Sequence, residues 1–189
     1  MLAREDPQQY LDTALVALSS DGDWRTVLDA LAAPIYMTDP EGAVTYWNAA
    51  CVELAGRESQ LGQDRWCVTW QIYSTTGERV PHEECPMADA IRSRKSVRDS
   101  VAIALRPDGS RIAFQPYPTP LFDRDGNFTG AVNMLIDVTE QQAVALSGEA
   151  QRCRRMADAM YDRTIREVLA TIASGFEKTV RELTSGAAD

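Results

Sequence analysis

The residues best suited to chemistry form one run, His82-Glu83-Glu84-Cys85-Pro86. Histidine, or a cysteine followed by proline, can ligate haem iron. The same run can instead be a loop that begins the next helix, because proline is favoured at the first helical position. We favour the loop, and His82 and Cys85 are the candidate iron ligands if haem binds.

A thiol-dependent enzyme is a second possibility, with Cys67 or Cys85 as nucleophile and His82 as base. Such catalysis needs a nucleophile, a base and a group that orients the base. The sequence shows no set of these three groups, and it has no glycine-rich loop that could hold a phosphate. The single histidine excludes multi-histidine metal sites. The four cysteines are far apart and form no CxxC pair, which favours reduced thiols in a cytoplasmic protein. We therefore expect no enzymatic activity.

Composition limits the partners of the chain. Its 189 residues are 44% hydrophobic and 25% charged, which is typical of one globular domain with extra helices. The net charge of -9 argues against nucleic acid, since phosphate binding needs a basic face. No apolar run approaches the ~20 residues that span a bilayer, and the first ten residues lack the apolar core of a signal peptide.

The stretch 126–138 is the element around which the others are organised. Apolar residues occupy both of its alternating phases, which predicts a strand covered on both faces, in the middle of a sheet. One polar residue, Asn133, interrupts this pattern. A buried amide on a central strand could form the back wall of a small pocket, and it needs hydrogen-bond partners.

The remaining pattern predicts an antiparallel α+β fold. Asp39-Pro40-Glu41-Gly42 has the composition of a type I turn and indicates a hairpin. The expected elements, in chain order, are helices over 7–20 and 24–32, strands over 35–38 and 44–47, helices over 49–54 and 86–93, strands over 97–105, 111–122 and 126–138, and long helices over 139–185.

Three segments together resemble the PAS domain family, the sensory module common in bacterial signalling proteins. They are IYMTDPEGAVTYWNAACVELAGR, LRPDGSR and PLFDRDGNFTGAVNMLIDVTE, with D-x-x-G, N-x-A and a late D-V-T-E in this order. The resemblance covers roughly residues 24–140. It implies a five-stranded antiparallel sheet with short helices on one face, flanked by an N-terminal helix in 1–23 and signalling or dimerisation helices in 141–189.

The resemblance also implies a small-molecule pocket between the sheet and the helices near 57–94. The strand phase of Asn133 usually faces this pocket, and alanines on neighbouring strands leave room there. Two alternatives stay open: the aromatic residues can stack on a ligand or fill space, and Asn133 can bind a ligand or a neighbouring protein group. The candidate ligand-binding residues are Tyr36, Thr38, Trp66, Trp70, Met87, Ile91, Ala104, Phe114, Asn133 and Leu135.

The cofactor is left open, with a haem- or flavin-dependent redox or gas sensor as the alternative function. Flavin-binding light sensors of this superfamily carry a reactive cysteine in an N-C-R-F-L-Q motif. Cys51 lies in NAACVELAG instead, so a flavin–cysteine adduct is not expected. A buried cysteine commonly acts as a small hydrophobic residue.

The family pattern sends a signal from the pocket through the helices after D-V-T. Asp137 and Thr139 are the candidate relay residues, and either one can cap the outgoing helix, while Asp137 can instead form an ion pair. The apolar stripe over 165–183 predicts a homodimer that passes the signal to a downstream domain or protein; in a monomer it would fold back on the sheet or lie exposed as a large apolar patch. Gly148 and Gly175 predict a bend or break in these helices rather than one straight rod.

Overall fold

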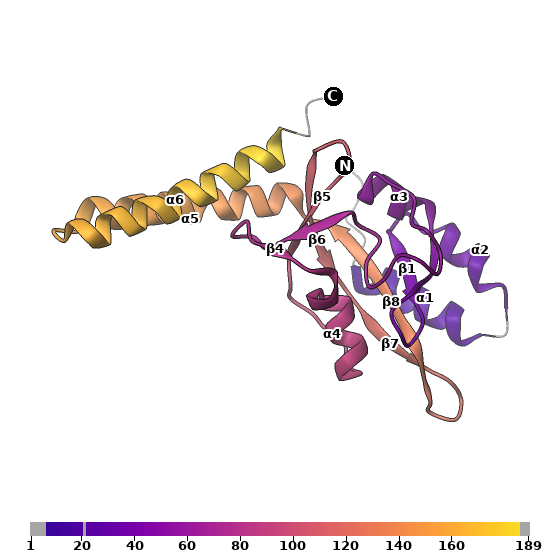
Figure 1. Cartoon of the computed structure of the whole chain (residues 1–189). Helices are drawn as coiled ribbons and strands as arrows, with labels where there is room; N and C mark the ends of the chain where they lie inside the picture. The colour runs from indigo at the N-terminus through magenta and orange to yellow at the C-terminus, as the bar shows by residue number, and fades with distance from the viewer. Residues whose placement is uncertain (1–6, 21, 186–189) are drawn as a thin grey trace.

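The computed structural model describes residues 7–20 and 22–185 and contains one antiparallel sheet (Figure 1). Its central strand is β8, Phe128–Asp137, as the sequence predicts. The strand order is β2-β1-β8-β6-β5-β3-β4, and β7 also pairs with β8. The other strands are β1 Ile35–Thr38, β2 Val44–Trp47, β3 Gln71–Tyr73, β4 Arg79–Val80, β5 Ala102–Leu105, β6 Arg111–Pro116 and β7 Thr119–Phe122.

The sheet differs in three ways from the five strands expected. The strand expected over 111–122 is divided into β6 and β7, which pair with successive parts of β8. The short strands β3 and β4 extend the sheet beyond β5, in a segment whose sequence pattern is irregular. The strand expected over 97–105 begins only at Ala102. The antiparallel α+β fold itself is confirmed.

Short helices cover one face of the sheet, which we call the inner face. They are α3 Ala49–Ala55, the 3-10 turn His82–Glu84 and α4 Pro86–Ser93. Asn48 caps α3 by accepting from the Cys51 backbone N–H at 3.3 Å, and Gly56 ends it in the left-handed region. Side chains from these helices and the inner face form one buried cluster.

The flanking helices pack on the opposite, outer face. Helices α1, Pro7–Ser19, and α2, Trp24–Asp29, cover β1, β2 and β8 through residues such as Leu11 and Leu28. Helices α5, Thr139–Ala159, and α6, Arg163–Thr184, cover β5 and β6. Successive side chains along each strand point to opposite faces of the sheet, so alternate residues pack in the inner cluster and under the flanking helices.

Helices α5 and α6 form a hairpin that projects from the sheet as an arm (Figure 1). Neither Gly148 nor Gly175 breaks a helix, because both residues lie inside continuous helices. The chain turns instead between Ala159 and Arg163, where the Asp162 carboxylate accepts from the Ile165 N–H at 3.0 Å and starts α6. The end of α6 folds back on the sheet, where Leu183 is 1% exposed.

Candidate functional site

The candidate site lies where the inner face of β8 meets β1. Tyr36 and Asn133 stand opposite each other on these strands, and both are almost fully buried. The Asn133 Nδ2 donates to the Tyr36 hydroxyl at 3.0 Å, and this hydroxyl donates to the Trp66 carbonyl at 2.9 Å. Burial raises the pKa of Tyr36 well above 10, with a further contribution from nearby Cys67, so the hydroxyl keeps its proton.

The side-chain oxygen of Asn133 accepts a hydrogen bond where the backbone pairing of the sheet is interrupted. Pro116 and Pro118 have no N–H to donate, and they flank Tyr117 between β6 and β7. The Tyr117 N–H donates both to the Met134 carbonyl at 2.8 Å and to the Asn133 Oδ1 at 2.9 Å. The amide therefore bonds to protein groups at both of its ends and joins the interrupted strand to β1.

The third member of this network, Trp66, has an unusual backbone conformation. Its φ of 69° lies in the left-handed region, which bulky residues rarely adopt. Its N–H donates to the Gly42 carbonyl at 2.7 Å, and its own carbonyl faces the core, with the Cys85 Sγ at 3.9 Å as a second, weaker donor. A side chain at Gly42 would collide with the Trp66 ring, so glycine is required there.

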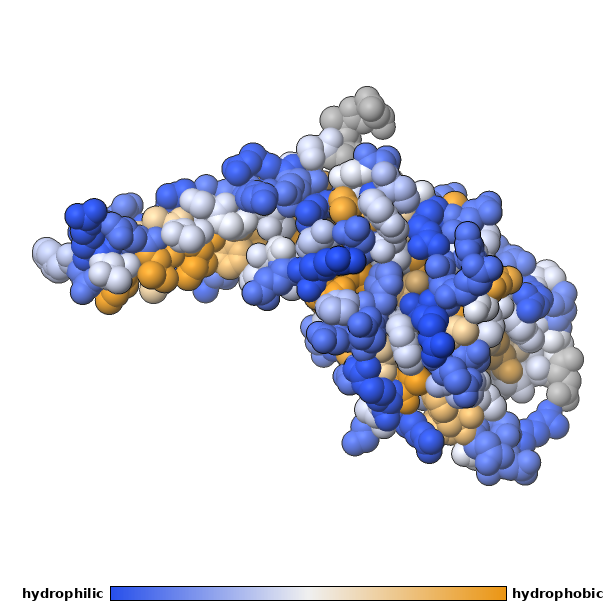
Figure 2. Space-filling model, in the orientation of Figure 1, coloured by the Kyte–Doolittle hydropathy of each residue, from blue (hydrophilic) through white to orange (hydrophobic). Residues whose placement is uncertain are grey.

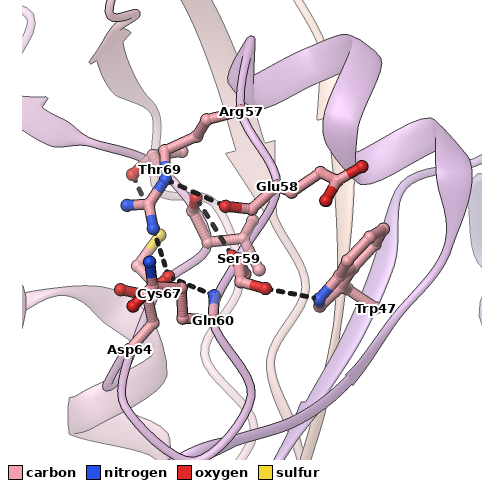
Figure 3. Close-up of polar contacts among 9 residues, drawn as sticks. Trp47, Arg57, Glu58, Ser59, Gln60, Asp64, Cys67 and Thr69 are labelled. Atoms are coloured by element: carbon pink, nitrogen blue, oxygen red, sulfur yellow. Dashed lines mark hydrogen bonds and ion pairs between the residues drawn. The ribbon is translucent and has the colours of Figure 1, made fainter.

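The segment 57–69 that carries Trp66 is fixed by its own polar contacts (Figure 3). The Trp47 indole N–H donates to the Ser59 carbonyl at 3.0 Å. Arg57 and Asp64 form an ion pair across the segment. The Cys67 Sγ and the Thr69 Oγ1 are hydrogen-bonded at 3.1 Å. These contacts hold the strained residue in place against the core.

Most of the candidate ligand-binding residues meet in this region. Trp66 is partly buried against the inner cluster, whereas Trp70 is 45% exposed and lies outside it. Buried side chains of the sheet and of α4 meet in this cluster. The candidate residues within the cluster are Tyr36, Met87, Ile91, Ala104, Phe114 and Leu135.

One buried polar atom beside this cluster has no partner among the described residues. Thr38 lies two residues beyond Tyr36 on β1, so both side chains belong to the same strand phase. Thr38 is 2% exposed, and its Oγ1 makes no hydrogen bond. A buried hydroxyl without a partner is costly, and a small polar molecule could satisfy it.

The residues considered for haem or thiol chemistry do not converge on one cavity. Cys85 is buried, and burial raises the pKa of its thiol to about 12, so the reactive thiolate is scarce at neutral pH. His82 lines an outer cleft of about 410 Å³ together with Trp70 and Arg79. Burial lowers the pKa of His82, although nearby Asp64 opposes this shift. The Cys85 thiol bonds to the Trp66 carbonyl at 3.9 Å and, among the described residues, not to His82, so the two side chains do not form a thiol–imidazole pair.

The candidate relay residues lie where β8 meets α5. The Asp137 carboxylate accepts from the Thr139 N–H at 2.8 Å, but the N-cap residue of α5 is Val138, so neither Asp137 nor Thr139 is the conventional cap expected. The Thr139 Oγ1 accepts from the Ala113 N–H at 3.0 Å and so ties the start of α5 to β6. Asp137 also lines a cleft of about 240 Å³ with Arg106.

Sequence reasoning missed the Trp66 carbonyl and the Tyr117 N–H as polar members of the site. A signal for Tyr117 exists, because prolines on both sides of one residue interrupt any ladder of hydrogen bonds. For Trp66 no local pattern indicates a left-handed backbone. Its conformation depends on contacts with Gly42, which lies far away in sequence.

Comparison with known families matches this chain to one model. The model is described as a PAS fold and matches residues 28–143, which is more than half of the chain. Comparison with curated proteins gave no significant match. None of the helices in residues 7–20 and 22–185 combines the length and apolar character needed to cross a membrane.

Several solved structures are similar to this chain at low sequence identity. The PAS domain of a protein from Colwellia psychrerythraea is 19% identical, with a TM-score of 0.47, and the match covers 61% of this chain and 94% of that one. An RNA-binding light-oxygen-voltage receptor is 20% identical, with a TM-score of 0.49 and coverage of 78% and 40%. The Rhodobacter sphaeroides LOV protein is 12% identical, with a TM-score of 0.46 and coverage of 95% and 99%.

Proposed function

The chain belongs to the PAS fold family, and from this premise we propose that it is a non-enzymatic sensory module of a signal-transduction protein. It detects a small polar molecule between the inner face of the sheet and α4. The module then relays this event through β8 to α5 and α6. Its partners are a second copy of the chain and a downstream signalling domain or protein.

The observation that carries the proposal is the buried network from Trp66 through Tyr36 and Asn133 to Tyr117. Each bond joins a different segment of the chain at the position where the ligand is expected. A ligand that hydrogen-bonds to Tyr36 or Asn133 has to replace at least one of these contacts. The unpartnered Thr38 hydroxyl nearby offers a further contact to a polar ligand.

The relay follows from the position of Asn133 on its strand. Asn133 and Asp137 lie on β8, and α5 begins two residues later at Thr139. A displacement of β8 changes the contacts of Thr139 with Ala113 on β6. Such a switch requires two states that differ by only a few kcal/mol, with the ligand favouring one of them.

Removal of one hydroxyl tests the coupling. Tyr36→Phe keeps the ring but breaks the bonds to Asn133 and Trp66, and we expect faster hydrogen exchange at the start of α5. Tyr46→Phe is the matched control, because it breaks only the 2.6 Å bond to Asp29 in the α1–α2 core. Equal exchange in α5 of both variants and the unaltered protein would contradict the relay.

The visible absorption spectrum of the purified protein tests the ligand class. We expect no haem or flavin band, because Cys85 is buried in the inner cluster whereas His82 lines an outer cleft, so the two candidate ligands do not share a site. A Soret band or a flavin spectrum at stoichiometric occupancy would replace this proposal with the redox- or gas-sensor alternative.

A further inference from the structure

One face of α6 packs against the sheet at its end and continues beyond the sheet without cover. Val180 and Leu183 contact the outer face of β5 and β6. Residues three or four apart share a helical face, so Ile172, Val168 and Ile165 extend the same face toward the tip of the arm. These three side chains are 43%, 54% and 49% exposed.

Helix α5 adds to this exposed face near the tip, where Met156 is 47% exposed. Figure 2 shows hydrophobic side chains gathered along the lower edge of the projecting arm. We call Met156, Ile165, Val168 and Ile172 the arm stripe. A contiguous apolar surface of this kind on a projecting element marks an interaction site.

Charge distinguishes the two ends of the arm. Residues 150–172, which run from α5 through the tip to Ile172 on α6, hold five arginines, two aspartates and Glu167, for a net charge of +2, whereas the whole chain carries -9. Three of the arginines pair with carboxylates of their own arm. Within the described residues Arg155 and Arg166 form no ion pair and keep their charge available.

An acidic segment borders the base of the arm on the stripe side. Residues 78–89 hold Glu78, Glu83, Glu84 and Asp89 against Arg79, for a net charge of -3, and the four carboxylates are exposed. The β3–β4 turn lies against α6, because a side-chain atom added to Gly77 would be 4.0 Å from the Thr179 Oγ1. Thr179 is on the face that continues into the arm stripe.

We propose that the arm stripe binds the arm stripe of a second copy in antiparallel orientation, so that each basic tip lies beside the partner's acidic segment 78–89. This inference rests on the homodimer of the proposed function and specifies its geometry. The identical apolar faces cover each other, as in a four-helix bundle. Parallel pairing would place two tips of charge +2 together, whereas antiparallel pairing brings opposite charges together.

The sequence sets the register of the pair. Ile165 and Ile172 lie at equal distances from the midpoint between Val168 and Leu169. A two-fold axis through this midpoint places Ile165 of each copy opposite Ile172 of the other. Val168 lies next to this axis, so it faces the middle of the partner's arm stripe in both the parallel and the antiparallel pair.

Disulfide cross-linking of the full chain tests the orientation in a Cys153→Ser background. Cys51, Cys67 and Cys85 are buried and do not compete. We expect I165C mixed with I172C to give a covalent dimer on mild oxidation with oxidised glutathione, while either variant alone stays uncross-linked. V168C should cross-link with itself, and S174C is the negative control, because Ser174 is exposed and lies two residues after Ile172, on the side of α6 opposite the stripe.

Each other outcome overturns a defined part of the inference. Self-cross-linking of I165C and of I172C alone would establish the parallel pair and overturn the antiparallel one. A dimer by sedimentation equilibrium without any stripe cross-link would overturn the interface and leave the homodimer standing. A monomer across the micromolar range would overturn the homodimer together with this geometry, while the sensory proposal would still stand on the Tyr36→Phe experiment.

Discussion

Tyr36 and Asn133 lie directly opposite each other on neighbouring strands, and the Asn133 Nδ2 donates to the Tyr36 hydroxyl at 3.0 Å. The bond therefore reinforces the pairing of β1 with β8 from within the core. Both residues are buried, and both also bond to backbone atoms of other segments. A polar pair of this kind fixes one arrangement of the sheet, because any slip in register leaves buried groups without partners.

We expect Asn133→Leu to lower the free energy of unfolding by about 1–3 kcal/mol, because Tyr36 and Tyr117 each lose a buried partner. Urea unfolding at fixed protein concentration measures the change. Met134→Leu on the outer face is the control and should cost less than about 1.5 kcal/mol. An Asn133→Leu variant as stable as the original would show that the amide instead serves a bound ligand.

Gly130 and Gly148 should respond oppositely to alanine. Gly130 has a φ of 134°, and an added Cβ would lie 2.0 Å from the Thr38 carbonyl oxygen, so Gly130→Ala should cost about 3 kcal/mol or more. Gly148 lies within α5 with no atom near its added Cβ, and Gly148→Ala should stabilise by about 0.5–1 kcal/mol. Thermal unfolding compares the two, and destabilisation by Gly148→Ala would contradict the continuous α5.

Much of the fold could be predicted from local patterns. The two-sided apolar character of 126–138 indicated the central strand, and Asn48 and Gly56 marked the ends of α3. These features depend on neighbours in sequence. The helices are interrupted at 160–162, where the apolar spacing changes between Met160 and Ile165, and not at Gly148 or Gly175. A glycine inside a helix costs only about 1 kcal/mol, which the packing of the arm offsets.

The candidate site was predicted less completely than the fold. The strand phases correctly brought Tyr36, Phe114 and Leu135 into one cluster. Whether a buried amide bonds to protein or ligand depends on contacts between distant segments, which no local spacing encodes. Trp70 illustrates this limit, because an aromatic residue next to a strand can face either the core or solvent.

Stability should depend on pH through His82. Its pKa is lowered from 6.5 in the folded chain, chiefly by burial, so the unfolded chain binds the proton more readily. The free energy of unfolding should therefore fall as pH drops below about 6.5 and be unaffected by His82 above it. Urea unfolding at about pH 7.5 and about pH 5.5 tests this.

The His82→Gln variant isolates the histidine from other acids. Asp23, Asp108 and Asp123 also have lowered pKa values because of local hydrogen bonds, and they destabilise the fold only in more acidic solution. Their effect is common to both proteins. We expect a smaller loss of stability between the two pH values in His82→Gln, and equal losses would contradict the buried neutral imidazole.

Docking of the arm should depend on Leu183. This side chain is 1% exposed and packs with Ile103, Ala113 and Leu146, so Leu183→Ala should cost about 2–5 kcal/mol. Leu61→Ala is the control, since Leu61 is 55% exposed and the change should stay within about 0.5 kcal/mol. If hydrogen exchange in Leu183→Ala becomes faster in α6 alone, the arm detaches before the sheet unfolds.

The interruption between β6 and β7 gives the protein a natural spectroscopic reporter. The Tyr117 N–H is shared between the Met134 carbonyl and the Asn133 Oδ1, and prolines flank it on both sides. Because neither neighbouring proline has a backbone N–H, the Tyr117 amide has no sequential amide neighbour in an NMR spectrum. Its chemical shift depends on the position of the Asn133 side chain. An NMR titration that follows this one resonance can detect occupancy of the inner face before any ligand has been identified.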